Sequence, residues 1–286
     1  MKKTACVVLA MLAGLCFSTD LFANGKDPQK KNYENEKFVW TDNYVTEGSN
    51  AAIAPSTEEI VTTCLSKDGK PLRWVRKNDI YKFGKYTGIS TLETALYNMA
   101  VDEMINNFEK DGTLRTGLLW GGVWTRDVSY SSLLSLSYMC PDKVKNSLEV
   151  KIDRMGRIIQ DTGTGGSWPC SSDRVVWALS AWNIYLATGD MEWLKKAYPV
   201  ITKSLECDDM VVFNPQTGLY RGESSFIDWR EQSYPTWAQP ADIYLSECLG
   251  TNAAYYGVLK VTADMAAALG YKKDVKKYTQ KAEALK

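Results

Sequence analysis

Histidine is absent from all 286 residues of the chain. Without an imidazole, the chain cannot build a Ser-His-Asp or Cys-His catalytic site, or a zinc site with histidine ligands. Acid–base chemistry would have to come from Asp, Glu, Tyr or Lys side chains. The missing histidine therefore excludes several common classes of hydrolase and metalloenzyme.

The chain also lacks an excess of charge, with 34 Lys and Arg residues against 34 Asp and Glu residues. This balance does not favour nucleic acid or an anionic membrane as a partner. The cysteines are widely spaced and form no CxxC pair, so we expect no metal site and no cofactor. In contrast, ten Trp and sixteen Tyr residues are many for this length. Aromatic rings fill protein cores and also stack on the apolar faces of sugar rings, so this content favours a carbohydrate ligand.

The first 23 residues have the pattern of a cleavable secretion signal. Lys2 and Lys3 precede an apolar stretch over residues 4–17, and Ala23 is suited to cleavage. An apolar stretch of about fourteen residues is too short to cross a bilayer, which needs roughly twenty. We therefore expect an exported protein, periplasmic or extracellular, without a membrane span, and a membrane anchor is the less favoured alternative.

Residues 24–89 differ in pattern from the rest of the chain. Residues 24–37 are polar and charged, which predicts a disordered lead-in. Short β-prone runs interrupted by Gly and Pro follow over residues 38–86. We expect irregular structure with a few short strands that cover one end of the main domain.

Helical spacing begins at Ser90, where Ser90 and Glu93 form a capping box before a helix that ends near residue 111. The spacing predicts further helices over residues 127–140, 142–160, 173–188, 190–213, 240–269 and 272–286. Their connections alternate between tight ones, at Pro141, Gly189 and Gly270, and long ones, over 111–126, 161–172 and 214–239. Helical hairpins with all long loops at one end follow from this alternation, and that end is the expected binding face.

The predicted fold class is therefore all-α: an (α/α)6 toroid of helical hairpins over residues 90–286, after an N-terminal segment of irregular and β structure. A helical solenoid is the alternative, but the sequence has no fixed repeat period. About seven helices are predicted, whereas a toroid of six hairpins needs twelve. We expect from this that the chain stops before its barrel closes.

The first candidate site lies at the end of the first long loop. Arg126 and Asp127 are adjacent there, and together they can donate to and accept from neighbouring sugar hydroxyls. Trp120 and Trp124 can supply a stacking wall beside them. An equally favoured alternative is that Asp127 caps the next helix and Arg126 is solvated.

The second candidate site surrounds Trp168, which lies in a glycine-flanked loop, and Asp173, at the start of the next helix. For Asp173, a role as helix N-cap is favoured over ligand binding. A packing role for Trp168 is not evident from the sequence.

The third candidate site, residues 222–231, contains three carboxylates among aromatic and arginine residues. An apolar environment raises the pKa of a carboxyl group and so suits it to protonate a leaving oxygen. Asp228, between Ile227 and Trp229, fits this role better than Glu223 or Glu231. The alternative is a surface salt-bridge cluster that involves Arg230.

These three segments, in this order and separated by helical hairpins, resemble the six-hairpin glycosidases, which include glucoamylase-like, trehalase-like and glucosidase-I-like enzymes and the barrels of rhamnosidases. Residues 124–127 are similar to a W-x-R-D element whose Arg and Asp bind hydroxyls of the non-reducing sugar. Residues 187–199 resemble a helix–turn–helix that recurs in this superfamily. Residues 224–229 resemble the segment that carries the general acid, which maps onto Asp228.

The resemblance implies an exported glycoside hydrolase that inverts configuration and acts from the chain end on α-linked glucosides or similar oligosaccharides. Its catalytic base would lie in a late barrel loop beyond Lys286, so we expect this chain to be inactive alone. A polysaccharide lyase on the same toroid and a non-catalytic carbohydrate-binding protein remain alternatives. The expected substrate contacts are Trp120, Trp124, Arg126, Asp127, Trp168, Asp173, Glu223, Trp229 and Arg230, with Asp228 as general acid.

Overall fold

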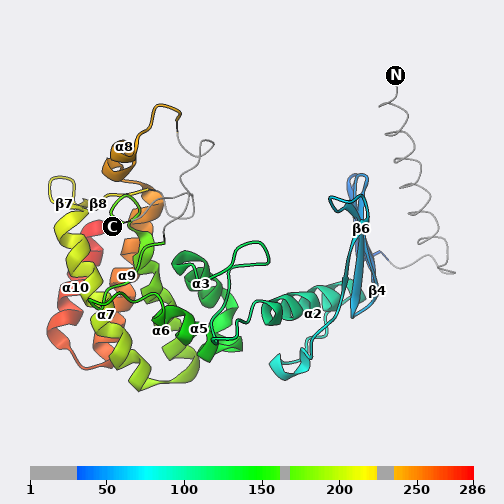
Figure 1. Cartoon of the computed structure of the whole chain (residues 1–286), viewed down its shortest axis with the longest axis horizontal. Helices are drawn as coiled ribbons and strands as arrows, with labels where there is room; N and C mark the ends of the chain where they lie inside the picture. The colour runs from blue at the N-terminus through cyan, green and yellow to red at the C-terminus, as the bar shows by residue number, and fades with distance from the viewer. Residues whose placement is uncertain (1–30, 162–167, 224–234) are drawn as a thin grey trace. The chain divides into compact units, whose positions relative to one another are not determined.

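The computed structural model describes residues 31–161, 168–223 and 235–286, so the predicted signal peptide lies outside the described residues. Two compact units divide the chain between Asn106 and Asn107 (Figure 1). Within the described part of the chain, no helix has both the length and the apolar character needed to cross a membrane.

The first unit contains a six-stranded antiparallel sheet in which each strand pairs with the next along the chain. The two-residue turn between the third and fourth strands uses Gly48, whose φ of +57° favours glycine. The β structure predicted for the N-terminal segment is therefore present, and it forms one continuous sheet. The fold class all-α describes only the part of the chain that follows. The strands are β1 (Tyr33–Glu34), β2 (Phe38–Trp40), β3 (Tyr44–Glu47), β4 (Asn50–Ser56), β5 (Glu59–Leu65) and β6 (Pro71–Val75).

Helix α2 (Thr91–Asn106) packs on β4 and β5 and shares their apolar core. That core consists of buried Ala54, Ile60, Leu92 and Ala95, surrounded by partly buried aromatic and aliphatic residues. The helix that the sequence predicts as the first of the toroid therefore forms one unit with the sheet. The units divide after residue 106 and not at residue 90.

The predicted capping box at the start of α2 forms only in part. The Ser90 hydroxyl accepts a hydrogen bond from the Glu93 backbone N–H at 3.1 Å, as predicted. The Glu93 carboxylate accepts from the backbone N–H of Ile89 at 2.8 Å. Both side chains thus satisfy amides near the helix start, where the first N–H groups have no helical partner.

Asp102 joins α2 to the end of β6 through buried hydrogen bonds. It accepts from Trp74 Nε1 at 2.9 Å, from the Asn78 backbone N–H at 2.9 Å and from Asn78 Nδ2 at 2.8 Å. Burial raises the pKa of Asp102, but the bonds from Trp74 and Asn78 outweigh it and hold the pKa below its ordinary value.

The second unit is built from helical hairpins (Figure 1). Helix α6 (Trp177–Thr188) turns at Gly189 into α7 (Met191–Val211), and α9 (Leu249–Ala268) turns near Gly270 into α10 (Lys272–Leu285). The tight connections predicted at both glycines are confirmed, and both residues have positive φ. The other helices are α3 (Thr125–Ser131), the π-helical turn η2 (Ser132–Leu136), α4 (Ser137–Met139), α5 (Pro141–Glu149), the 3-10 turn η3 (Asp173–Val176) and α8 (Pro240–Leu245).

Helix α6 lies at the centre of this unit and packs against α3, α5, α7 and α9. Its first residue, Trp177, is wholly buried and donates its indole N–H to the Leu148 carbonyl at 2.9 Å. Trp193 of α7 likewise donates to the Ala181 carbonyl at 3.0 Å. Because their polar atoms are bonded, these large rings can fill the core without leaving a buried donor unsatisfied.

Two predicted helices differ from the structure. The helix predicted over 142–160 ends at Glu149, because Asp153 accepts from the backbone N–H groups of Met155 and Arg157 and so closes a turn. The helix predicted over 240–269 is divided into α8 and α9. Between them, Ser246 is extended and accepts a backbone hydrogen bond from Gly222 at 2.9 Å.

We predict that Asp102→Asn lowers the free energy of unfolding of the first unit by about 1–3 kcal/mol, because the new amide N–H₂ faces groups that donate. The contribution of the carboxylate is present above about pH 4 and is lost as the pH falls through its lowered folded-state pKa. The deficit of the variant should therefore shrink in acid. Hydrogen exchange of the β6 amides at several pH values measures it, with Glu103→Gln, on an exposed position of α2, as the control. A deficit that is constant with pH would contradict the role assigned to Asp102.

Candidate functional site

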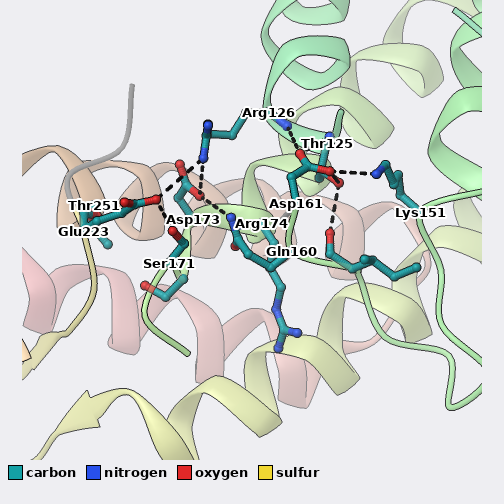
Figure 2. Close-up of polar contacts among 12 residues, drawn as sticks. Thr125, Arg126, Lys151, Gln160, Asp161, Ser171, Asp173, Arg174, Glu223 and Thr251 are labelled. Carbon is teal, nitrogen blue, oxygen red and sulfur yellow. Dashed lines mark hydrogen bonds and ion pairs between the residues drawn. The ribbon is translucent and has the colours of Figure 1, made fainter. Parts of the chain in front are cut away.

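The three long loops of the second unit bring three of the predicted site residues together (Figure 2). Arg126 is the second residue of α3, Asp173 begins η3, and Glu223 follows the hairpin of β7 (Phe213–Asn214) and β8 (Leu219–Tyr220). Arg126 Nη1 lies 3.8 Å from Asp173 Oδ1 and 3.8 Å from Glu223 Oε1. We refer to Arg126, Asp173 and Glu223 as the Arg126 cluster.

The Arg126 cluster is buried, although all its members carry charge. Asp173 and Glu223 are each 1% exposed, and the Arg126 side chain is 14% exposed. Charged groups are costly to bury even in pairs, so buried ionic clusters contribute little to stability for their cost. Such clusters are typical of sites where the charge is needed for binding or catalysis.

Glu223 is held by contacts to its side chain and to both sides of its backbone. The Ser171 hydroxyl donates to Glu223 Oε1, and the Thr251 hydroxyl donates to the Glu223 carbonyl. The Glu223 N–H donates to the Cys170 carbonyl at 3.0 Å. Burial and the Glu223 carboxylate both raise the pKa of the Cys170 thiol, so this thiol is a poor nucleophile.

The strand that leads into Glu223 is fixed by α9. Asn252 accepts from the Tyr220 backbone N–H at 2.8 Å and donates to the Tyr220 carbonyl at 2.9 Å. The Tyr220 ring stacks on the Tyr255 ring with centroids 3.8 Å apart. A hairpin of only two paired residues per strand is marginal alone, so these contacts with α9 hold it in place.

Asp173 does not cap a helix, so the interpretation that the sequence favours for it is wrong. It lies inside η3, whose N-cap position is Ser172, without a capping side-chain hydrogen bond. Its Oδ1 instead accepts from Gln160 Nε2 at 3.0 Å. Gln160 Oε1 accepts the backbone N–H of Arg174 at 2.8 Å. The carboxylate of Asp173 is thereby turned toward Arg126.

The cap of α3 also comes from an unexpected residue. Asp161 accepts from the backbone N–H of Thr125 and, at 3.3 Å, from that of Arg126. Lys151 Nζ lies 2.7 Å from Asp161 Oδ1. Asp127, which the sequence offers as a cap, lies in the first turn of α3 and is exposed.

The tryptophans of the candidate site have different roles. The rings of Trp120 and Trp124 meet edge to face at 6.3 Å, and Trp120 is 59% exposed, as a stacking surface requires. Trp168 instead packs inward: its indole N–H donates to Asp208 at 2.9 Å, and the Arg174 guanidinium lies 4.8 Å from its ring centre. Trp168 therefore has the packing duty that is not evident from the sequence.

Asp208 of α7 is wholly buried and bonds to Arg174, the residue after Asp173. Besides Trp168, it accepts from Arg174 Nη2 at 2.8 Å and from the Tyr255 hydroxyl at 3.0 Å. Burial raises the pKa of Asp208, although Arg174, the Tyr255 hydroxyl and the Trp168 indole act to lower it.

The predicted general acid Asp228 and its neighbours Trp229 and Arg230 lie outside the described residues. Glu223 is the last described residue before them. Over residues 31–161, 168–223 and 235–286, no group of three or more His, Cys, Asp and Glu residues is placed to hold a metal ion.

Sequence reasoning did not find several residues that hold the Arg126 cluster in place. A carboxylate that caps a helix 36 positions away leaves no local motif. The same holds for an amide that bridges two segments. The helical spacing favoured a helix over residues 158–160, where the structure has only an isolated bridge at Ile158. The residues are Lys151, Gln160, Asp161, Ser171, Asp208 and Thr251.

Residues 160–286 match the family model described as the bacterial alpha-L-rhamnosidase 6 hairpin glycosidase domain. The matched region contains Asp173 and Glu223, whereas Arg126 lies before it. The resemblance to the six-hairpin glycosidases is therefore confirmed. No curated protein matches the chain.

Gly222 tests how tightly the Glu223 backbone is held. Its φ is +130°, and a Cβ there would lie 2.5 Å from Ser172 Oγ. We predict that Gly222→Ala displaces Glu223 and lowers the melting temperature more than Gly218→Ala does. Gly218 also has positive φ, at +78°, but a Cβ there meets nothing within 4 Å, so only backbone strain of about 1 kcal/mol is expected. Equal shifts in the two variants, measured by differential scanning calorimetry, would refute the close packing at Gly222.

Proposed function

We propose that this protein is a glycoside hydrolase that binds the terminal sugar of an α-linked oligosaccharide at the Arg126 cluster. The observation that carries the proposal is that one charged residue from the start of α3, one from the start of η3 and one from the segment after β8 meet in the same buried cluster. The match of residues 160–286 to a six-hairpin glycosidase domain supports the reaction class.

The chemistry of the Arg126 cluster suits sugar hydroxyls. A hydroxyl both donates and accepts, so it can donate to a carboxylate while it accepts from the guanidinium. Hydrogen bonds between such groups are about 2.8 Å long. A hydroxyl that enters between Arg126 and either carboxylate can bridge them. Because both carboxylates are 1% exposed, the 3.8 Å contacts must open to admit it. Two neighbouring hydroxyls can thus be held at once, one toward Asp173 and one toward Glu223.

The aromatic residues add an apolar surface beside these polar groups. Trp120 is exposed next to Trp124, and Trp124 directly precedes the helix that carries Arg126. In the proposed complex, the face of the sugar ring stacks on Trp120 while its hydroxyls reach the cluster. Asp127, Trp229 and Arg230 are proposed as further contacts on the basis of the sequence.

We assign the role of general acid to Asp228 from the sequence resemblance. An inverting enzyme needs an acid that protonates the leaving oxygen and a base that activates water on the opposite face of the sugar. Glu223 precedes Asp228 by only five positions, so one member of the cluster is close to the proposed acid in the sequence. We further propose that the hairpins form part of an (α/α)6 toroid and that the protein is exported.

The family match favours α-L-rhamnosides as the first substrates to test, ahead of the α-glucosides that the sequence motifs suggest. The two classes differ in the orientation of their hydroxyls, and the Arg126 cluster can hold a neighbouring pair in either. A panel of 4-nitrophenyl α-L-rhamnoside, α-D-glucoside and α-D-mannoside separates them.

Because the base is expected in a late barrel loop beyond Lys286, the assay uses a gene product that includes those loops. In that protein, we predict that Asp228→Asn lowers kcat about 10²- to 10⁴-fold on an α-linked disaccharide of the sugar that the panel selects. The loss should be smaller on the 4-nitrophenyl glycoside, because nitrophenolate leaves without protonation. NMR of the first-formed product gives the anomer, which should be inverted. Asp264→Asn, an exposed carboxylate of α9, is the control and should leave kcat unchanged.

The alternative functions give different results in the same assay. A polysaccharide lyase would release an unsaturated product that absorbs in the ultraviolet. A carbohydrate-binding protein would bind sugar without turnover, in the wild type as well as in the Asp228 variant. Either result would overturn the proposed hydrolysis.

A further prediction concerns Arg126. Replacement by Gln leaves Asp173 and Glu223 buried without their guanidinium, so we expect sugar binding to weaken by about 2–5 kcal/mol. Isothermal titration with the selected monosaccharide measures this loss. Arg154→Gln, at an exposed position of the same unit, is the matched control. Unchanged affinity in Arg126→Gln would place the sugar elsewhere.

A further inference from the structure

Gln160 and Asp161 are adjacent residues, and each contacts a different member of the Arg126 cluster: Gln160 contacts Asp173 and Asp161 contacts Arg126 (Figure 2). Gln160 donates to the Asp173 side chain, and Asp161 binds the backbone of Thr125 and Arg126. Both are 5% exposed. One short segment thus touches both sides of the Arg126–Asp173 ion pair.

The side-chain amide of Gln160 is fixed in one orientation by its two partners. Its Nε2 donates to Asp173 Oδ1 at 3.0 Å, and its Oε1 accepts the Arg174 N–H at 2.8 Å. An amide meets both demands, whereas a carboxylate can accept from Arg174 but cannot donate to Asp173. The site therefore discriminates between Gln and the nearly isosteric Glu.

Asp161 sets the start of α3. The first N–H groups of a helix have no partner within the helix, and here the Asp161 carboxylate accepts from those of Thr125 and Arg126. The Thr125 hydroxyl adds a contact to Oδ1 at 3.3 Å. Because Arg126 itself is bound through its backbone, a shift of Asp161 moves the origin of the Arg126 side chain.

The segment that carries Gln160 and Asp161 is attached to α7 and to Arg174 through Ile158. The Ile158 N–H donates to the Ser204 hydroxyl of α7 at 2.9 Å, and the Ile158 carbonyl accepts from Arg174 Nη1 at 3.0 Å. Lys151, at 2.7 Å, compensates the charge of Asp161. The pair therefore lies on a rigid support, which a positioning role requires.

We propose that Gln160 and Asp161 are positioning residues that set the separation of Arg126 from Asp173, Gln160 through the Asp173 carboxylate and Asp161 through the first turn of α3. This inference rests on the proposed function of the Arg126 cluster as the sugar site. Neither residue needs to touch the sugar.

The first experiment needs no ligand. Hydrogen exchange of the free protein is followed at Thr125 and Arg126 in Asp161→Ala and in Asp161→Asn. Loss of a cap should speed exchange about five- to thirtyfold in the Ala variant, whereas the Asn variant keeps an acceptor oxygen and should stay near the wild type. Lys151→Met, which leaves the acceptor in place, should also keep its protection. Unchanged exchange in Asp161→Ala would overturn the role of Asp161.

The second experiment uses L-rhamnose and D-glucose as probes, with affinity followed by tryptophan fluorescence from pH 4 to 8. Gln160→Glu places a second carboxylate about 3 Å from that of Asp173. The two can remain this close only if one of them takes up a proton. We expect affinity at least tenfold weaker near pH 7 and partly restored in acid. Gln280→Glu, at an exposed position of α10, adds the same charge and should follow the wild type.

The two experiments separate this inference from the proposed function. If the wild type binds neither sugar, the proposed sugar site fails, and the exchange rates still decide whether Asp161 fixes α3. If the wild type binds, a loss in Gln160→Glu that is equal at all pH values reflects general structural damage and overturns the role of Gln160. A loss confined to neutral pH supports it.

Discussion

Asp208 lies in the last third of α7 without any solvent exposure and accepts hydrogen bonds from three other segments. Arg174 comes from the start of the η3–α6 helix, Trp168 from the loop before it, and Tyr255 from α9. Loss of this one carboxylate would leave the buried Arg174 guanidinium without its charged partner, at a cost of about 3–5 kcal/mol. Because Arg174 directly follows Asp173 in the chain, the bond between Arg174 and Asp208 also helps to fix the position of Asp173. The contacts between α7, the η3–α6 helix and α9 thus depend on one buried, strongly hydrogen-bonded side chain.

Above this contact, the site is assembled by hydrogen bonds between segments that are far apart in the chain. Asp161 binds the start of α3, Gln160 joins Asp173 to its own loop, and Ser171 reaches Glu223. Each bond adds a partner to a buried charged or backbone group, and each also fixes the direction of that group. The helical hairpins provide the frame, and these polar bonds attach the described loop residues next to the cluster to it. The cluster can be buried because its members contact one another and accept hydrogen bonds from Gln160 and Ser171.

The elements that the sequence predicts well are those fixed by local contacts. Helices α6 and α7 have long apolar repeats and a connection at Gly189, and both lie within a few residues of the predicted bounds. The sheet was underestimated because its strands are short and gain their order from neighbours and from α2. Residue type and position next to the long loops make Arg126, Asp173 and Glu223 candidate site residues, and their role in binding stays a prediction. Their supports were not predicted, because the partner of Asp161 lies 36 positions earlier in the chain and no local pattern records it.

The charge of the Arg126 cluster bears on the kind of sugar that it can bind. Among the described residues, the cluster sets two carboxyl groups against one guanidinium. A neutral sugar adds no charge and satisfies both signs through its hydroxyls. A uronate, the substrate that an eliminating lyase needs, would bring a third carboxylate next to Asp173 and Glu223, where like charges repel at low dielectric. The composition of the cluster is therefore consistent with the neutral glycoside that we propose as substrate.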